Sequence, residues 1–232
     1  MDYHDLLDKL QGSGLNVFSP SDVARLADIS IRSAYVKINR MFKMKKIYKI
    51  ENGKFCLSDD PFIASTQITH PSYISFSTAM YLHGKFQQVI NEVFVITSKK
   101  KARLMIFNMP VIFITIKPEL IFGYNKVKKG DSYIFLADFE KALVDSLYLP
   151  RYMTIGAVFD VMQAGFKKKL FEEYVLRMNS ESVLRRAGYL LERLGYETRL
   201  KPNTKTTYKL NPTFKSKKTF NSKWKLYINE RI

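Results

Sequence analysis

The sequence has little of several things that mark common classes of protein. It contains one cysteine, Cys56, and three dispersed histidines, so it can form neither an internal disulfide nor a zinc site of the usual Cys and His spacing. Its best apolar stretch, residues 105–116, is interrupted by Asn108 and Pro110 and is too short to span a bilayer. The first residues do not resemble a signal peptide. We therefore expect a reduced, cytoplasmic protein with no membrane partner.

Motifs for catalysis are also missing. No glycines have the spacing of a phosphate-binding loop. Glu140 and Lys141 are adjacent, so on a helix they point about 100° apart, and we expect Lys141 to pair with Asp145 on a helix surface. His83 is expected at a helix end, without a partnering nucleophile. We predict no catalytic residue, metal or cofactor and hence no enzyme. The alternative left open is a metal-dependent nuclease or nucleotidyltransferase.

Positive charge is what the chain has in excess. Its 38 Lys and Arg residues stand against 21 Asp and Glu residues, a formal net charge of +17, while 46% hydrophobic residues are ample for a core. Most of the excess lies in two blocks, residues 30–54 with net charge +7 and residues 201–232 with net charge +8. Such blocks attract polyanions and speed association with them. The alternative is a Lys-rich surface that serves solubility alone.

Helix and turn signals at the N-terminus predict a winged helix-turn-helix. Ser19 followed by Pro20 and Asp22 is a strong helix start. Asn52-Gly53 between two apolar runs favours a tight hairpin. The predicted elements are helices over residues 2–11, 20–27 and 31–45, and strands over residues 47–50 and 55–57.

The third predicted helix divides into two faces at 100° per residue. The core face is expected to hold Ile31, Ala34, Ile38, Met41 and Phe42. The opposite face carries side chains suited to reading bases in the major groove: Arg32, Ser33, Val36, Lys37, Asn39 and Arg40. Flanking cations are predicted to contact phosphates: Lys43, Lys45, Lys46, Lys49 and Lys54. The alternative is a winged helix that contacts proteins.

The rest of the chain predicts a mixed α/β domain, so the expected fold class is α+β. We place the DNA-binding domain at residues 1–62 and the second domain at residues 63–232, with a possible subdivision near 150–200. The expected helices cover residues 76–83, 139–149, 154–163 and 167–178 and one that starts at Ser180, with Ser75 and Asp138 as caps. The expected strands cover residues 89–97, 102–107, 111–117, 133–136, 207–210 and 224–228.

Aromatic residues alternate with lysines in the second basic block. This pattern suits a further nucleic-acid surface, on a duplex or on single strands. The alternative, which we favour, is a solvated strand pair whose aromatic side chains face the core. The candidate residues of this additional surface are Lys217, Lys218, Lys223 and Lys225, with Phe220, Trp224 and Tyr227 between them.

Three stretches together resemble the AbiEi family of antitoxins and regulators. They are the predicted winged helix, the segment 71–84 (PSYISFSTAMYLHG) and the segment 140–148 (EKALVDSLY). The resemblance covers about residues 15–150, and residues 151–232 match only loosely. It implies an antitoxin of abortive-infection systems for virus defence. Such a protein binds inverted repeats in its own promoter, represses its operon and counteracts a nucleotidyltransferase-like toxin.

Two alternatives remain for how such a protein counteracts its toxin. The resemblance implies neutralisation without a stable complex, with the C-terminal domain involved in neutralisation and in cooperative DNA binding. The other hypothesis is that the second domain is an interaction module that holds the toxin directly.

Overall fold

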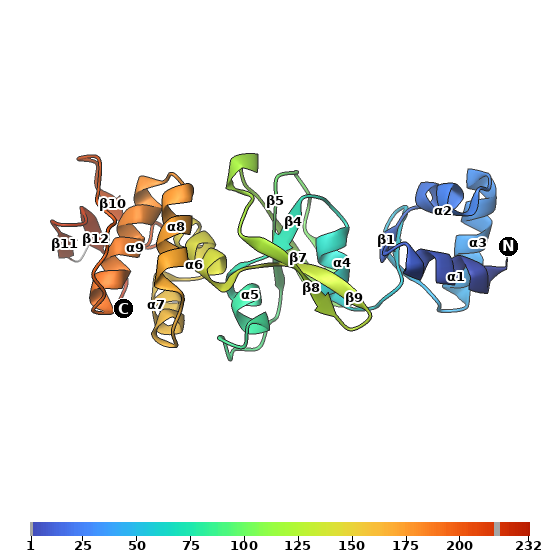
Figure 1. Cartoon of the computed structure of the whole chain (residues 1–232), viewed down its shortest axis with the longest axis horizontal. Helices are drawn as coiled ribbons and strands as arrows, with labels where there is room; N and C mark the ends of the chain where they lie inside the picture. The colour runs from blue at the N-terminus through green and yellow to red at the C-terminus, as the bar shows by residue number, and fades with distance from the viewer. Residues whose placement is uncertain (1, 216–218) are drawn as a thin grey trace. The chain divides into compact units, whose positions relative to one another are not determined.

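The chain has a mixed α+β fold. The computed structural model describes residues 2–215 and 219–232 (Figure 1). Contacts divide these residues into two compact units. The first contains the chain up to Ile74 together with Asn91–Ile116 and Lys126–Phe135, and the second contains Ser75–Ile90, Lys117–Asn125 and Leu136–Ile232. Among the described helices, none has the length and apolar character needed to cross a membrane. The domain division predicted at residues 62 and 63 stays a prediction.

Three helices and a small antiparallel sheet form the N-terminal part of the first unit. The Ser19 hydroxyl accepts the backbone N–H of Asp22, and the Asp22 carboxylate accepts that of Ser19, so the predicted helix start is confirmed as a capping box. The sheet has the strand order β1-β3-β2. The elements are α1 (Tyr3–Gly12), β1 (Val17–Phe18), α2 (Pro20–Ala27), α3 (Ile31–Lys43), β2 (Tyr48–Glu51) and β3 (Lys54–Cys56).

The core of this part corrects the prediction for the third helix. Ala34, Ile38 and Met41 are fully buried, but Ile31 and Phe42 are 52% and 45% exposed. The three buried residues span about 60° of the helix at 100° per residue, so the core touches a narrower stripe than the 100° expected. Other elements fill the remaining volume, with Leu6, Leu10, Phe18, Val23, Ile47 and Phe55.

Cys56 lies in β3 and is completely buried. Burial is the main reason why the pKa of its thiol is raised to about 11. The thiol therefore stays protonated and unreactive at neutral pH.

A six-stranded sheet lies mainly in the first unit, in the order β6-β7-β5-β4-β9-β8. Strands β5 and β7 pair in parallel, whereas β4 with β5 and β6 with β7 are antiparallel. Four strands were predicted, but α4, β4 and β8 were not. β4 has only three residues, and β8 carries mostly polar side chains because it is an edge strand. The elements are α4 (Pro61–Gln67), β4 (Ser72–Ile74), β5 (Val93–Thr97), β6 (Leu104–Ile106), β7 (Met109–Thr115), β8 (Tyr124–Lys129) and β9 (Ser132–Ala137).

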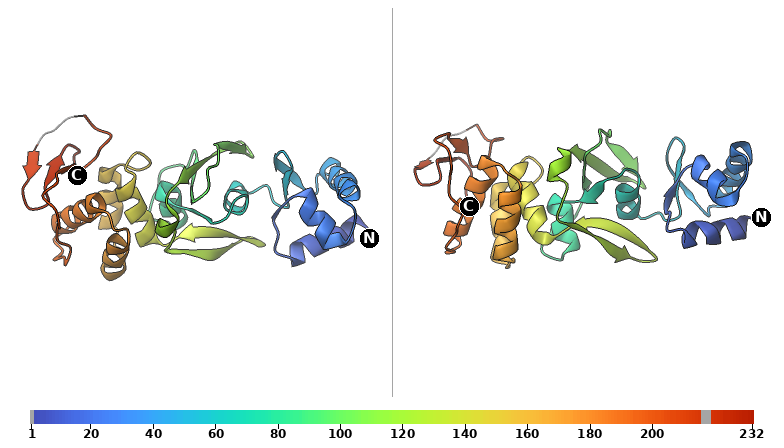
Figure 2. Two further views of the ribbon diagram at one scale, coloured as in Figure 1. Left: turned by 90° about the horizontal axis from the view of Figure 1, so that it is seen from above. Right: turned by 45° about the horizontal axis from the view of Figure 1, so that its top comes forward.

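The second unit is mainly helical, and the predicted helices are confirmed with small shifts of their ends. Helix α6 packs against α5, α7, α8 and α9, and Figure 2 shows α8 and α9 next to each other. A parallel and an antiparallel pairing join the last strands in the order β10-β12-β11, of which β11 was not predicted. The elements are α5 (Phe76–Leu82), η1 (Pro118–Leu120), α6 (Phe139–Tyr148), α7 (Ile155–Gln163), α8 (Lys168–Arg177), α9 (Glu181–Arg193), β10 (Tyr208–Lys209), β11 (Thr219–Asn221) and β12 (Leu226–Ile228).

Helix α9 anchors the C-terminal strands through two buried contacts. The indole of Trp224 packs directly on Gly188, where a Cβ atom would overlap with the ring. The buried guanidinium of Arg186 donates to the carbonyl oxygens of Leu210 at 2.8 Å, Leu147 at 2.7 Å and Lys209 at 3.2 Å. Burial lowers the pKa of Arg186 to about 10. A glycine and a buried cation are thus structural requirements of this unit.

Candidate nucleic-acid interface

The outward face of α3 carries the residues predicted to read bases. Arg32, Ser33, Val36, Asn39 and Arg40 are all exposed, as the helical spacing predicted, whereas Lys37 is half-buried. Helices α2 and α3 pack together across a short turn in which Asp28 has a left-handed φ of 51°. The structure therefore brings these side chains together on one exposed helix face.

The start of α3 is defined by a serine cap. The Ser30 hydroxyl accepts the backbone N–H of Ser33 at 3.1 Å, and the two hydroxyl oxygens lie 2.9 Å apart. Ser33 is therefore partly engaged in the cap. Arg32 and Arg40, in contrast, form no side-chain hydrogen bond or ion pair with other residues of the described chain. Their guanidinium groups are available to a partner.

Four of the five predicted phosphate-binding lysines lie free at the surface. Lys43, Lys45, Lys46 and Lys49 are exposed, and no side-chain partner for them occurs among the described residues. Lys54 differs. Its ammonium donates to the Ile68 carbonyl oxygen at 2.6 Å and lies 3.6 Å from the Glu51 carboxylate. Lys54 thus contacts other residues of the first unit, while its side chain stays 36% exposed.

An exposed apolar edge runs along α3 beside the polar face. Tyr35 is 50% exposed and lies one turn from Ile31. The sequence prediction placed Tyr35 on neither face. Its spacing of four residues from Ile31 and from Asn39 was the signal that could have linked it to both. Phe42 belongs to the same edge.

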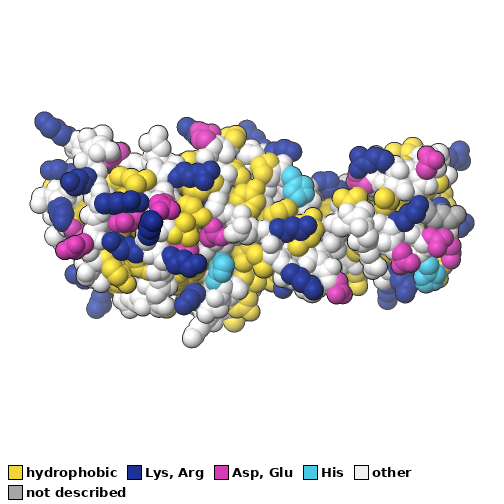
Figure 3. Space-filling view, viewed as in Figure 1, with side chains coloured by type: hydrophobic (Ala, Val, Ile, Leu, Met, Phe, Trp, Pro, Cys, Tyr) yellow, Lys and Arg dark blue, Asp and Glu magenta, His cyan; other side chains and the backbone are white. Residues whose placement is uncertain are grey.

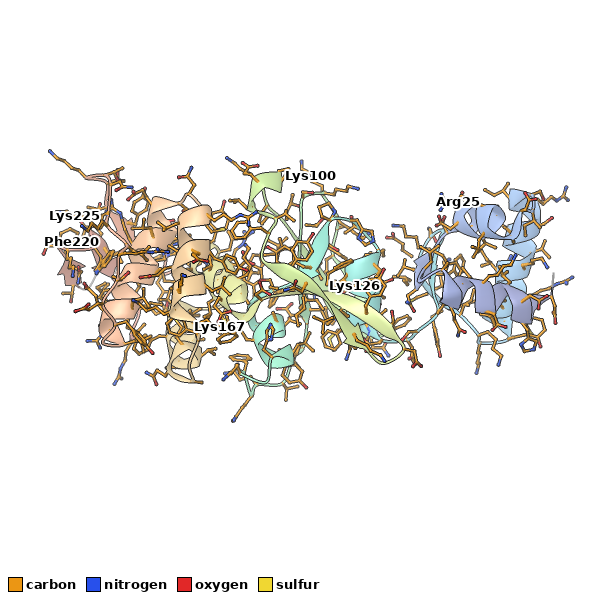
Figure 4. The ribbon with its side chains drawn as sticks, viewed as in Figure 1. Arg25, Lys100, Lys126, Lys167, Phe220 and Lys225 are labelled. Atoms are coloured by element: carbon orange, nitrogen blue, oxygen red, sulfur yellow. The ribbon has the colours of Figure 1, made fainter. Side chains whose placement is uncertain are left out.

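The second basic block lies in the C-terminal strands and their connections. Lys223 pairs with Glu192, which also accepts the indole N–H of Trp224 at 2.6 Å. Lys225 is half-buried, while Phe220 is 43% exposed beside it in Figure 4. Trp224 is buried, so the interpretation of aromatic side chains facing the core holds for it and fails for Phe220. Lys217 and Lys218 lie outside the described residues.

On the face shown in Figure 3, Lys and Arg side chains are spread over both ends of the chain, with fewer acidic side chains among them. The charge excess seen in the sequence is therefore visible at the surface. In each block the contacts above place one lysine at a carboxylate, Lys54 at Glu51 and Lys223 at Glu192.

The two segments that carry the family resemblance meet in the second unit. The Ser75 hydroxyl donates to Asp145 at 2.7 Å, and Asp145 also pairs with Lys141. Lys141 is completely buried and its ammonium lies 4.4 Å from the centre of the Phe122 ring. The predicted ion pair is thus present, but in the interior instead of on a helix surface, because α5, α8 and α9 all pack around α6. Neither Ser75 nor Asp138 forms the predicted side-chain cap.

An open cavity of about 520 Å³ lies in the second unit. The His83 ring nitrogen lies 2.8 Å from the Ala137 carbonyl oxygen, and the Glu140 carboxylate accepts the backbone N–H of Lys167 at 2.8 Å. Lys85 and Lys167 also line the cavity. Groups of three or more His, Cys, Asp or Glu residues able to hold a metal are absent from the described chain. The polar groups of this cavity are largely committed to the fold.

The comparisons with known proteins give information on the fold alone. No family model and no curated protein matches the chain. The crystal structure of the RV2827C protein from Mycobacterium tuberculosis matches 95% of this chain and 89% of its own, with 13% identity and a TM-score of 0.55. The chain shares an α+β fold with that protein. Since identity is low, the likeness carries no information on ligand or activity.

Proposed function

We propose that the chain is a sequence-specific DNA-binding repressor built on an N-terminal winged helix-turn-helix. The observation that carries the proposal is the outward face of α3, where two unpaired arginines stand with an amide and a small apolar side chain. Arginine pairs with guanine and asparagine with adenine in the major groove. The hairpin β2–β3 next to α3 would serve as the wing.

The order and packing of the N-terminal elements support this proposal. A helix pair joined by a short turn is followed by a β-hairpin, and the second helix of the pair presents its polar face outward. Lysines after α3 and on β2 flank that face. Phosphate contacts of this kind fix the register of a protein on DNA without reading sequence.

The biological role we propose is that of an AbiEi-like antitoxin. The chain would bind inverted repeats in its own promoter, repress its operon and counteract a nucleotidyltransferase-like toxin. The support is the resemblance in segments 71–84 and 140–148, whose residues Ser75, Lys141 and Asp145 join in one buried network. Co-purification of the two proteins tests whether the second unit contacts the toxin directly.

The proposal includes no catalytic activity of the chain itself. Of the residues weighed for a nuclease, Lys141 and Asp145 are buried and bind each other. Glu140 is also buried and accepts a backbone N–H. A metal-dependent reaction needs convergent acidic groups that can reach a substrate. Incubation with labelled DNA or RNA and Mg²⁺ or Mn²⁺ tests this point, and cleavage or nucleotide addition would contradict it.

The first test is a salt titration of DNA binding. The full chain is titrated onto the DNA upstream of its own gene and onto a scrambled duplex of equal length. We expect tight binding to the upstream DNA alone, with log K falling linearly against log salt concentration by about 0.9 per phosphate contacted. Equal and steeply salt-dependent binding to both duplexes would contradict sequence-specific repression.

A further inference from the structure

An unexpected apolar edge borders the proposed reading face of α3. Ile31, Tyr35 and Phe42 are 52%, 50% and 45% exposed. At 100° per residue these three side chains fall within about 40° of one another. The edge lies between the buried stripe of the helix and its polar face. It therefore reaches solvent beside Arg32 and Asn39.

The positive charge around this edge favours a negatively charged partner. Lys43, Lys45, Lys46 and Lys49 are exposed and unpaired among the described residues, within a segment of net charge +7. A second copy of the chain would bring the same positive charge against this surface and be repelled. Duplex DNA offers the opposite charge together with apolar groups, since thymine methyls project into the major groove.

We propose that Ile31 and Tyr35 contact the C5 methyl groups of thymines next to the bases read by Arg32 and Asn39. The inference rests on the proposed DNA-binding function. It narrows that function to duplexes with thymine next to the bases that Arg32 and Asn39 read. Ile31 and Tyr35 lie in the N-terminal half of α3, the part of a recognition helix that contacts base edges. Phe42, near the other end of α3, lies closer to the lysines that are predicted to contact phosphates.

The size of the effect follows from the chemistry of one methyl group. Uracil differs from thymine only in lacking the C5 methyl, so it keeps every hydrogen-bonding group of the base pair. Burial of one methyl against an apolar side chain is worth about fourfold in affinity. Replacement of a contacted thymine by uracil should weaken binding by about this factor.

The experiment uses the full chain and a duplex selected from a random 20-bp pool. Each thymine of the selected duplex is then replaced singly by uracil, and the dissociation constants are compared. We expect at least one thymine whose replacement costs about fourfold with the unaltered chain and nothing with Tyr35→Ala or Ile31→Ala. Tyr35→Phe keeps the ring and should retain the sensitivity.

Two control variants separate this contact from others. Val36→Ala removes an apolar group of the polar face and should leave the sensitivity at that thymine unchanged. Tyr81→Ala removes a tyrosine of similar exposure, 43%, from α5 and should leave DNA binding unchanged. Circular dichroism and thermal unfolding establish that each variant is folded.

The outcomes distinguish the inference from the function on which it rests. Enrichment of a sequence whose uracil forms bind as tightly as the thymine form would overturn the inference and leave the repressor function standing. No enrichment of any sequence would overturn both. If sedimentation shows a dimer that Tyr35→Ala converts to monomer, the edge is a contact between copies and the inference is wrong.

Discussion

The two basic blocks have similar net charge but different surroundings. In residues 30–54, two arginines and four lysines have no side-chain partner among the described residues. In residues 201–232, Lys223 pairs with Glu192 and Lys209 donates to the Phe214 carbonyl oxygen at 3.2 Å. Helix α9 beside that block buries two further cations, Arg185 and Arg186. The difference that matters for stability is therefore between the exposed cations of α3 and the buried cations of α9.

The comparison predicts that positive charge is dispensable for stability in α3 and indispensable in α9. Exposed cations stabilise a fold little, since water solvates them equally well in the unfolded chain. A buried guanidinium that satisfies several carbonyl groups leaves those groups unpaired when it is removed. Variants in the two regions sharpen or break this contrast, taken from the largest expected effect to the smallest.

Gly188→Ala should have the largest effect on the second unit. The added methyl would overlap with the Trp224 ring, so the helix and the strands must move apart. We expect a loss of about 3 kcal/mol in unfolding free energy, the upper part of the usual range for overpacking. Urea unfolding followed by the fluorescence of Trp224, the only tryptophan, measures it.

The matched control for that variant is Gly12→Ala. A Cβ at Gly12 would meet no atom within 4 Å, and its backbone is not left-handed. This variant should change stability by less than about 0.5 kcal/mol. An unchanged urea midpoint for Gly188→Ala would show that Trp224 does not pack on α9 as described.

Arg186→Met should destabilise the second unit by about 3 kcal/mol. It keeps much of the side-chain volume but leaves the carbonyls of Leu147, Lys209 and Leu210 without their donor. Thermal unfolding measures the loss. Arg40→Met is the matched variant in the other region and should leave the melting temperature within a degree or two. Similar losses for both would break the comparison between the regions.

Arg40→Ala should weaken binding to the specific duplex by about 1–3 kcal/mol without changing stability, if Arg40 reads a base. Fluorescence anisotropy with specific and scrambled duplexes measures it. Replacing Lys45, Lys46 and Lys49 together by Gln should instead weaken both duplexes alike and lower the salt slope by up to about three. Unchanged affinity of Arg40→Ala would remove this residue from the reading face.

Lys223→Gln should have the smallest effect, below about 1 kcal/mol, because the lysine of the ion pair with Glu192 is exposed. Burial raises the pKa of the Glu192 carboxyl, but hydrogen bonds from Lys223 and Trp224 lower it more, so the net pKa lies below its usual value. The stabilisation is therefore present above the usual carboxyl range and is lost as pH falls through the lowered pKa.

Urea midpoints of Lys223→Gln and the unaltered chain at pH 6 and pH 3 check this sign. The difference between them should shrink at pH 3, and also in 1 M salt at pH 6. A difference that grows on acidification would contradict the pairing.

Local signals in the sequence predicted much of the secondary structure. The Ser19 box, the Asn52-Gly53 turn and the helices after Ser30 and Thr154 depend on neighbouring residues, and the structure confirms them. The short or polar elements α4, β4, β8 and β11 escaped prediction. Of these, β4 pairs with β5 and β9, which come much later in the chain, whereas β8 and β11 pair with the strands that follow them, β9 and β12.

The sequence predicted which side of α3 faces outward, but not how far the exposed surface of the helix extends. Helical periodicity alone indicates which side chains of α3 point the same way, and Arg32, Asn39 and Arg40 are exposed as expected. Periodicity cannot show how wide a core the helix meets. The core that α3 contacts is narrow, so Ile31 and Phe42 lie outside it.

The sequence by itself determined the helix starts, the hairpin and the two positive blocks, since these depend on residues close together in the chain. Only the tertiary structure decided which charges are free. Lys54 reaches the Ile68 carbonyl oxygen, and Lys141 and Asp145 pair in the interior, because distant segments supply their surroundings. Burial is a property of packing between elements.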